Sequence, residues 1–179
     1  MKRTRINYIF IVLLSSSLIC SLSYMYLHLK QDRIKVAFLI VDKMNLMLNV
    51  VNLNGDTIKH FPIAVGTNLG DKEKVGDFKT PEGLFTIQRI EDSKSWKYDF
   101  EYDDLGPVPG AYGPYFIRLR VPKHKGIGIH GTHDNSTIGK RVSHGCIRMK
   151  NEDLLQLVEM VSTGIPVMIN EDKIDESKN

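Results

Sequence analysis

A cysteine and several histidines lie close together in the C-terminal half of the chain. The block Ser143–Met149 reads SHGCIRM, and His130 stands sixteen residues before Cys146. A cysteine attacks a carbonyl as its thiolate, so it needs a nearby base and backbone N–H groups that stabilise the oxyanion. His130 can supply the base, and the carbonyl of Gly131 can orient its imidazole. These residue types are compatible with acyl transfer through a cysteine.

The residues next to Cys146 could complete such a site. A thiol and an imidazole at hydrogen-bonding distance form a thiolate and an imidazolium, which we expect for Cys146 and His130. The backbone N–H groups of His144, Gly145 and Cys146 could form the oxyanion hole. Arg148 could hold a substrate carboxylate through two hydrogen bonds. The glycine at position 145 allows a sharp turn and removes a side chain that would block a substrate.

Two other interpretations of this cluster remain open on residue types alone. A single cysteine is more often inert core filling than a nucleophile. His130, His133, His144 and Cys146 are also ligand types that zinc accepts, but their spacing lacks the regularity of structural zinc sites. This spacing makes a metal site the weaker alternative, which the residue types alone leave open. Cys20 lies in an apolar N-terminal segment, which leaves Cys146 without an intramolecular disulfide partner.

Short apolar segments typical of buried strands make up most of the chain from residue 34 onward. The pair Asn54-Gly55 predicts a tight hairpin turn, and Thr80–Gly83 predicts a second turn. A polar loop over Thr132–Val142 separates the strand that ends on His130 from the cysteine block. We expect strands over Ile34–Val41, Leu46–Leu53, Thr57–Val65, Leu84–Ile90, Pro114–Val121, Gly126–His130 and Ile165–Ile169.

One amphipathic helix is expected after the cysteine block. Asn151 can cap its N-terminus, Glu152 and Asp153 lie at the positive end of the helix dipole, and Gly164 ends it. The apolar stripe consists of Leu154, Leu155, Leu157, Val158 and Val161. The charged tail, residues 171–179, should be disordered. The domain should therefore be mainly β, with this one short helix.

An aromatic segment precedes the predicted site. Trp96, Tyr98, Phe100 and Tyr102 alternate with polar residues, and the Gly/Pro-rich residues 106–110 cannot continue a regular element. One interpretation is a short strand with its aromatic face on the core. The other is a flap that places these rings, with Tyr112, beside the substrate.

The N-terminal segment differs from the rest of the chain. Residues 8–29 contain no charged side chain, and at about 1.5 Å per residue they could cross a membrane as one helix. Basic residues before them favour a cytoplasmic N-terminus and an outward domain. A cleaved signal peptide is the alternative. We therefore predict a basic stub with a transmembrane helix over residues 1–33, a catalytic domain over 34–170 and a tail over 171–179.

Charge is unevenly distributed along the chain. Residues 1–33 carry a net charge of +4, so the remainder carries −1 of the total +3. A near-neutral domain gives no reason to propose nucleic-acid binding. Residues 118–150 nevertheless carry eight cations against Asp134, a net of +7. This surplus is either a solvated face or an attraction for a carboxylate-bearing substrate or a polyanionic wall.

Several motifs together closely resemble the signature of the L,D-transpeptidase catalytic domain, also called the YkuD domain. The block Ser143–Met149 with the upstream His130-Gly131-Thr132 carries most of the resemblance. Further matching segments bring the resemblance to about residues 34–170. These segments are Val65-Gly66, Thr80–Gly83, Ile138-Gly139 and Asn151–Leu157.

This resemblance implies a β-sandwich-like fold and a cysteine acyltransferase acting on peptidoglycan stem peptides. By the resemblance, Cys146 attacks the carbonyl of the L-centre in an L,D peptide bond, releases the terminal D-amino acid and passes the acyl group to an amine. His130 would be the general base and acid. The resemblance and the residue chemistry together give the orienting and oxyanion residues Gly131, His144 and Gly145, and the substrate-binding residues Ser143, Arg148 and Tyr112.

The resemblance also sets the alternatives and the expected location. Family members need no metal and are acylated by carbapenems, so the resemblance implies that no metal or other cofactor is needed. An L,D-carboxypeptidase would use water as the acceptor on the same cysteine, and a wall-binding module would lack catalysis. We expect a bacterial cell-envelope protein that is held in the membrane by its N-terminal helix, with its domain outside the cytoplasm. We also expect a monomer with no nucleic-acid partner.

Overall fold

The computed structural model describes residues 14–26, 35–99 and 106–172. Residues 14–26 form a helix, and within the described residues no helix is long and apolar enough to cross a membrane. The predicted transmembrane helix is therefore not found among the described residues. The other residues of the predicted span, 8–13 and 27–29, lie outside the described ranges. Met1–Lys35 and Val36–Asn179 are separate units.

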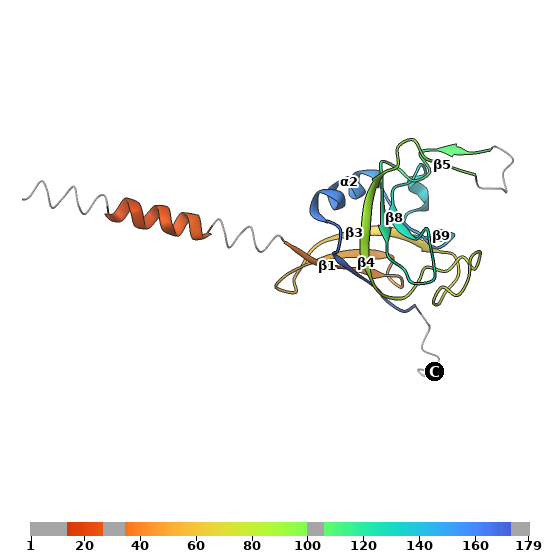
Figure 1. Cartoon of the computed structure of the whole chain (residues 1–179), viewed down its shortest axis with the longest axis horizontal. Coiled ribbons are helices and arrows are strands. Elements are labelled where there is room, and N and C mark those ends of the chain that lie inside the picture. Colours follow the sequence, from red (N-terminus) through yellow and green to blue (C-terminus); the bar gives the residue numbers. More distant parts are fainter. Residues whose placement is uncertain (1–13, 27–34, 100–105, 173–179) are drawn as a thin grey trace, which may run out of the picture. The chain divides into compact units, whose positions relative to one another are not determined.

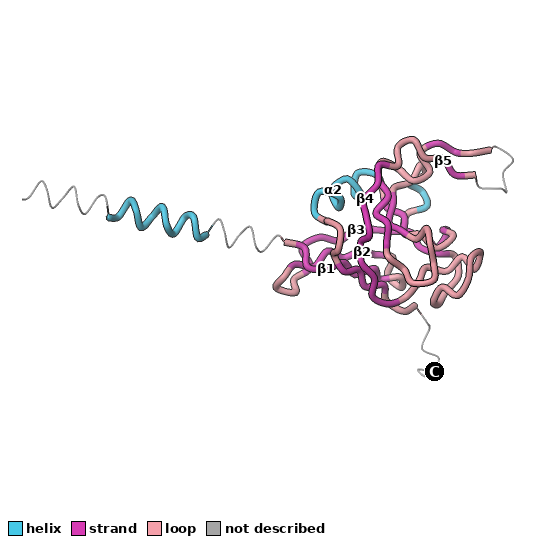
Figure 2. The backbone as a smooth tube through the Cα atoms, viewed as in Figure 1, coloured by secondary structure: helices cyan, strands magenta, loops and turns pink. Residues whose placement is uncertain are grey.

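Nine of the eleven described strands of the second unit form one sheet that closes on itself, and Figures 1 and 2 show these strands. Within the described residues its order is β10-β8-β7-β4-β11-β1-β2-β3-β9, and β10 also pairs with β3. The predicted sandwich is thus one strongly curved, closed sheet. All seven predicted strands are present. The bounds are β1 Val36–Asp42, β2 Met47–Asn52, β3 Thr57–Gly66, β4 Gly83–Asp92, β7 Tyr115–Leu119, β8 Gly128–His130, β9 Arg141–Ser143, β10 Ile147–Met149 and β11 Pro166–Ile169.

Alternate residues of these strands fill the interior of the closed sheet. Side chains of a strand point to opposite faces, so one apolar face of each strand can be buried while the other faces outward. Ile117, Ile129 and Ile147 lie side by side on β7, β8 and β10 and are fully buried. The same core includes Leu39, Val41, Leu48, Val50, Phe61, Ile63, Ile87, Val167 and Ile169.

Helix α2, Asn151–Met160, follows β10 as predicted, but its ends differ from the prediction. Leu154 and Leu157 are fully buried in the core, which stabilises the fold by about 1.5–3 kcal/mol for each side chain. The N-cap is Lys150, which makes no side-chain capping bond. The helix ends at Met160, four residues before the predicted terminator Gly164.

A buried ion network joins the domain to its C-terminal end. Lys43 is fully buried, and its Nζ lies 2.8 Å from Glu82 Oε1 and 3.2 Å from Asp172 Oδ1. Asp172 Oδ2 lies 2.7 Å from Arg141 Nη2, and Asp172 Oδ1 accepts the N–H of Gly70 at 2.7 Å. Asp172 was assigned to the disordered tail, which is wrong for this residue because two cations and a backbone donor hold it in the interior. Residues 173–179 lie outside the described ranges.

Candidate active site

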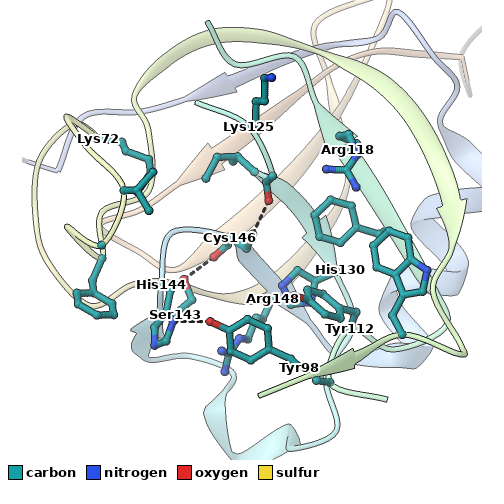
Figure 3. Close-up of a pocket in the computed structure, with 18 of the residues that line it drawn as sticks. Lys72, Tyr98, Tyr112, Arg118, Lys125, His130, Ser143, His144, Cys146 and Arg148 are labelled. Atoms are coloured by element: carbon teal, nitrogen blue, oxygen red, sulfur yellow. Dashed lines mark hydrogen bonds between the residues drawn. The ribbon is translucent and has the colours of Figure 1, made fainter. Parts of the chain in front are cut away.

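The pairing of β8 with β10 brings the predicted nucleophile and base onto one face of the sheet. These parallel strands pair Ile147 with Ile129 and Arg148 with His130. Since both isoleucines point into the core, Cys146, Arg148 and His130 point to the opposite side. There they line a cavity of about 550 Å³ (Figure 3).

The environment of His130 fixes its tautomer. Its ring is 4% exposed, and Nδ1 donates to the carbonyl oxygen of Gly131 at 2.7 Å, the orienting bond expected from the sequence. Because a carbonyl only accepts, Nδ1 carries the proton, and Nε2 is the basic nitrogen of the neutral ring. Burial lowers the pKa of His130 to about 3 and outweighs the opposing effect of the Gly131 bond, and Arg148 adds a smaller lowering. His130 is therefore neutral at neutral pH.

Aromatic rings hold the His130 imidazole in place. The Phe116 ring stacks on it, with centroids 5.5 Å apart and planes 9° from parallel, and the Tyr112 ring lies 5.0 Å away. Gly128 makes this arrangement possible, because a side chain at this position would lie 2.3 Å from the Phe116 ring. Burial raises the pKa of Tyr112 to about 12, so its hydroxyl stays protonated at neutral pH.

Cys146 is half-buried and in the thiol form. Its Sγ donates to the carbonyl of Gly126 at 3.4 Å, and within the described part of the chain no hydrogen bond joins it to His130. Burial raises the pKa of Cys146, and this effect exceeds the lowering by a backbone hydrogen bond from Gly128 and by nearby cations. The predicted thiolate–imidazolium pair is therefore wrong for this state, because burial disfavours the charged form of both residues.

Ser143 shapes the loop that carries Cys146. Its hydroxyl is buried, donates to the Cys146 carbonyl at 2.5 Å and accepts the Gly145 N–H at 3.1 Å. These bonds engage the Ser143 hydroxyl inside the loop, and the contact of Ser143 with substrate stays a prediction, since the residue lines the cavity. They also occupy the Gly145 N–H, so His144 and Cys146 are the remaining N–H candidates of the predicted oxyanion trio.

Gly145 is required by packing within the protein. Its φ of +126° lies in a region that favours glycine, and a Cβ there would lie 2.7 Å from the carbonyl oxygen of Lys79. The loop over residues 67–82 thus packs directly on the residue before Cys146. This contact and the positive φ explain the need for glycine, and the room that it leaves for substrate stays a prediction.

The aromatic segment covers the cavity as a flap. Strands β5 (Lys97–Tyr98) and β6 (Val108–Pro109) pair with each other, and Trp96, Tyr98 and Tyr112 line the cavity. The flap interpretation therefore holds for Trp96 and Tyr98, whereas Phe100 and Tyr102 lie outside the described residues. The Tyr98 hydroxyl lies 2.9 Å from His144 Nδ1. His144 thus connects the flap to the cysteine loop.

Asn151 has a role that the sequence did not reveal. Its Oδ1 accepts the Thr132 N–H at 3.0 Å instead of capping α2. A side chain at Gly113 or Gly131 would approach this oxygen to 2.3 or 2.1 Å. Asn151 therefore packs tightly between these two glycines and fixes the segment whose carbonyl orients His130. The sequence analysis missed this role because Asn151 meets Gly113 and Gly131, two residues distant in the sequence, only in the folded structure.

Among the charged residues that line the cavity, cations outnumber acids. Lys72, Arg118, Lys125 and Arg148 surround Cys146, as Figure 3 shows, and Asp99 is the one acid among the described lining residues. Three of these cations belong to the basic stretch found in the sequence, whereas Lys72 comes from the distant loop over residues 67–82. Within the described ranges no group of three potential metal-ligating side chains could hold a metal ion.

Comparison with known proteins assigns the family. A model of the L,D-transpeptidase catalytic domain, YkuD, matches residues 37–169. The chain belongs to this family. The YkuD protein of Bacillus licheniformis, whose name classes it with the L,D-transpeptidases, is 36% identical over 129 residues, covering 66% of this chain and 62% of the relative. The chain thus spans less than two thirds of that relative's length.

Solved structures share the fold. The helical cell shape determining protein Pgp2 from Campylobacter jejuni is 25% identical, with a TM-score of 0.55 over 78% of this chain and 49% of that protein. The catalytic domain of the Enterococcus faecium L,D-transpeptidase gives a TM-score of 0.54 at 24% identity, over 74% of this chain and 95% of that domain. The second match extends over nearly the whole of an isolated catalytic domain, so this chain and that domain share the fold.

Proposed function

We propose that this protein is a peptidoglycan L,D-transpeptidase in which Cys146 is the nucleophile and His130 is the general base and acid. The observation that carries the proposal is the placement of Cys146 and His130 on one face of β8 and β10, inside the cavity of a domain that belongs to this family. A neutral imidazole with a fixed tautomer can accept the thiol proton directly at Nε2.

The proposed reaction proceeds through a thioester. The Cys146 side chain turns from the Gly126 carbonyl toward His130, whose Nε2 takes the thiol proton as sulfur bonds to the carbonyl carbon of the L-centre. N–H groups of the cysteine loop stabilise the oxyanion. The C–N bond then breaks, and the terminal D-amino acid leaves with the proton from His130. An amine of a second stem peptide gives a proton to His130, attacks the thioester and restores the thiol.

The remaining site residues have supporting roles in this proposal. Arg148 and the protonated Tyr112 hydroxyl face the cavity and are positioned to bind the donor peptide. Ser143, Gly145 and Gly131 hold the loop and the imidazole in place through the bonds described above. A carbapenem that acylates Cys146 should therefore form an adduct of defined mass.

The substrate class places the proposed activity in the bacterial cell envelope, outside the cytoplasm. The cationic lining of the cavity suits a substrate that carries carboxylates. Anchoring by residues 8–29 stays a prediction that a membrane-fractionation experiment on the full chain would test.

Product analysis tests the proposal. The full chain is incubated with disaccharide-tetrapeptide, and the products are weighed by mass spectrometry. We expect cross-linked dimers and free D-amino acid, and none of either with Cys146→Ala. Tripeptide without dimers would instead indicate the L,D-carboxypeptidase. Retention on cell-wall sacculi without any thiol-dependent product would indicate a binding module. Dimers formed by Cys146→Ala would contradict the assigned nucleophile.

A further inference from the structure

The loop over residues 67–82 places one buried lysine against the cysteine loop. The Lys72 side chain is 6% exposed, although it lines the open cavity that contains Cys146. Its Nζ lies 3.4 Å from the position that a Cβ would take on Gly145. The ammonium therefore lies against the backbone at the site where the thiolate and the oxyanion would form. Figure 3 shows Lys72 on the opposite side of Cys146 from His130.

A carboxylate behind the lysine fixes this placement. Asp77 Oδ1 lies 2.7 Å from Lys72 Nζ, and Asp77 is not among the residues that line the cavity. The same carboxylate accepts three backbone N–H bonds, from Glu73 at 2.7 Å, Lys74 at 2.9 Å and Lys79 at 3.1 Å. Burial raises the pKa of Asp77, but the bonds from Lys72 and these N–H groups outweigh it and lower the pKa overall.

This arrangement orients the ion pair between Lys72 and Asp77. The negative end of the ion pair is turned toward the loop backbone, where three dipoles already stabilise it. The positive end is turned toward the cavity. A buried ammonium held in this way acts on developing negative charge without having to reorganise, which is the condition under which electrostatic stabilisation is strongest.

We propose that Lys72 is a further active-site residue whose ammonium, held by Asp77, stabilises negative charge on Cys146 Sγ and on the oxyanion beside Gly145. The oxyanion half of the proposal rests on the function proposed above, whereas the thiolate half does not. Lys72 also lowers the pKa of Cys146, which agrees with this geometry. The other charged or titratable residues that line the cavity with Cys146, among those the structure describes, are Tyr98, Asp99, Tyr112, Arg118, Lys125, His130, His144 and Arg148.

The pH dependence of thiol alkylation tests the thiolate half without any substrate. A neutral alkylating agent, iodoacetamide, is applied to the full chain carrying Cys20→Ser, so that Cys146 is the one thiol, and the adduct is followed by intact mass. For Lys72→Met we expect the alkylation pKa to rise by about one unit. At a pH well below that pKa, Lys72→Met should have about a tenfold smaller thiolate fraction than the parent, and its thiolate should be about threefold more nucleophilic. The alkylation rate should therefore be about threefold lower.

Two variants on the same loop and on the same residue serve as controls. Lys74→Met removes the same charge from an exposed side chain that does not line the cavity, and its profile should match that of the parent. Lys72→Arg keeps the charge and should restore most of the parent profile. A Lys72→Met profile that coincides with the parent profile overturns the proposal.

Folding and the proposed function can be separated from this result. Cooperative thermal melting by circular dichroism shows whether Lys72→Met is folded. If it is not, the double variant Lys72→Gln with Asp77→Asn replaces it, because removing both partners leaves no unpaired buried charge. If the Lys72→Met profile is shifted but the parent chain makes no peptidoglycan product, the role of Lys72 is supported and the proposed function is refuted. If the parent chain makes the expected products but the Lys72→Met profile is unshifted, the proposed function is supported and the role of Lys72 is refuted.

Discussion

Replacement of Asn151 by alanine should impair both the stability and the chemistry of the protein. In the folded state, Asn151 Oδ1 accepts the Thr132 N–H at 3.0 Å, and Thr132 is 2% exposed. Water cannot readily replace the lost acceptor there. An unsatisfied buried donor costs about 1–3 kcal/mol in the free energy of unfolding, so for a domain of this size the melting temperature should fall by roughly 3–15 °C.

The effect on chemistry distinguishes the two roles considered for Asn151. Loss of a helix N-cap would cost about 0.5–2 kcal/mol, which overlaps the value above, so stability alone does not decide. A cap, however, has no effect on His130. If Asn151 holds the segment whose carbonyl orients that imidazole, a displacement of this carbonyl should slow acylation of Cys146 by about 10- to 100-fold.

The measurements are thermal melting by circular dichroism and the rate of carbapenem adduct formation by intact mass. Asn151→Asp is the matched control, because it keeps an acceptor oxygen and places a negative charge at the start of α2, where the helix dipole favours it. This variant should retain most of the stability and most of the rate. An Asn151→Ala variant with a lowered melting temperature but the parent rate of acylation would refute the positioning role and favour a helix-capping role for Asn151.

Three further results are expected. Gly128→Ala should destabilise the fold by about 1–3 kcal/mol in thermal melts, because the new methyl group would lie 2.3 Å from the Phe116 ring. In the Cys20→Ser background, alkylation of Cys146 should rise about tenfold per pH unit from pH 6 to 8, and a plateau in this range would contradict the neutral thiol and imidazole. The pKa of His130 falls from 6.5 to about 3 on folding, so the unfolded chain binds this proton first as pH drops. Relative to His130→Phe, the parent should therefore lose about 1.4 kcal/mol of unfolding free energy for each pH unit between pH 6.5 and 3. Denaturant unfolding of both proteins measures this loss, and a difference between their midpoints that does not change with pH would refute it.

The strands and the central helix could be predicted because local patterns determine them. Apolar segments of strand length gave all seven predicted strands, and the stripe containing Leu154 and Leu157 gave α2. Cys146 and His130 could be singled out because their residue types are rare and chemically specific. The tautomer of His130 was also predictable, since the carbonyl of Gly131 is adjacent in the sequence.

Features that depend on contacts between distant segments could not be predicted. Lys43 and Asp172 are separated by 129 positions, and nothing near either residue indicates that both are buried together. Asn151 has the residue type and position of a helix cap, so its bond to Thr132 could not be foreseen. The protonation state of Cys146 was predicted wrongly because burial, which raises a thiol pKa, is a property of the folded structure.

The register of three strands explains how the fold holds the site residues together. Along β7, β8 and β10, Ile117, Ile129 and Ile147 pair in one row that is buried in the core. The adjacent row pairs Phe116, His130 and Arg148 on the opposite face. A slip of one residue in any of these strands would turn its isoleucine out of the core, and on β8 or β10 it could turn His130 or Arg148 inward, so the packing of the core holds the site in register. The apolar row thus provides the energy that keeps His130 beside the cysteine loop.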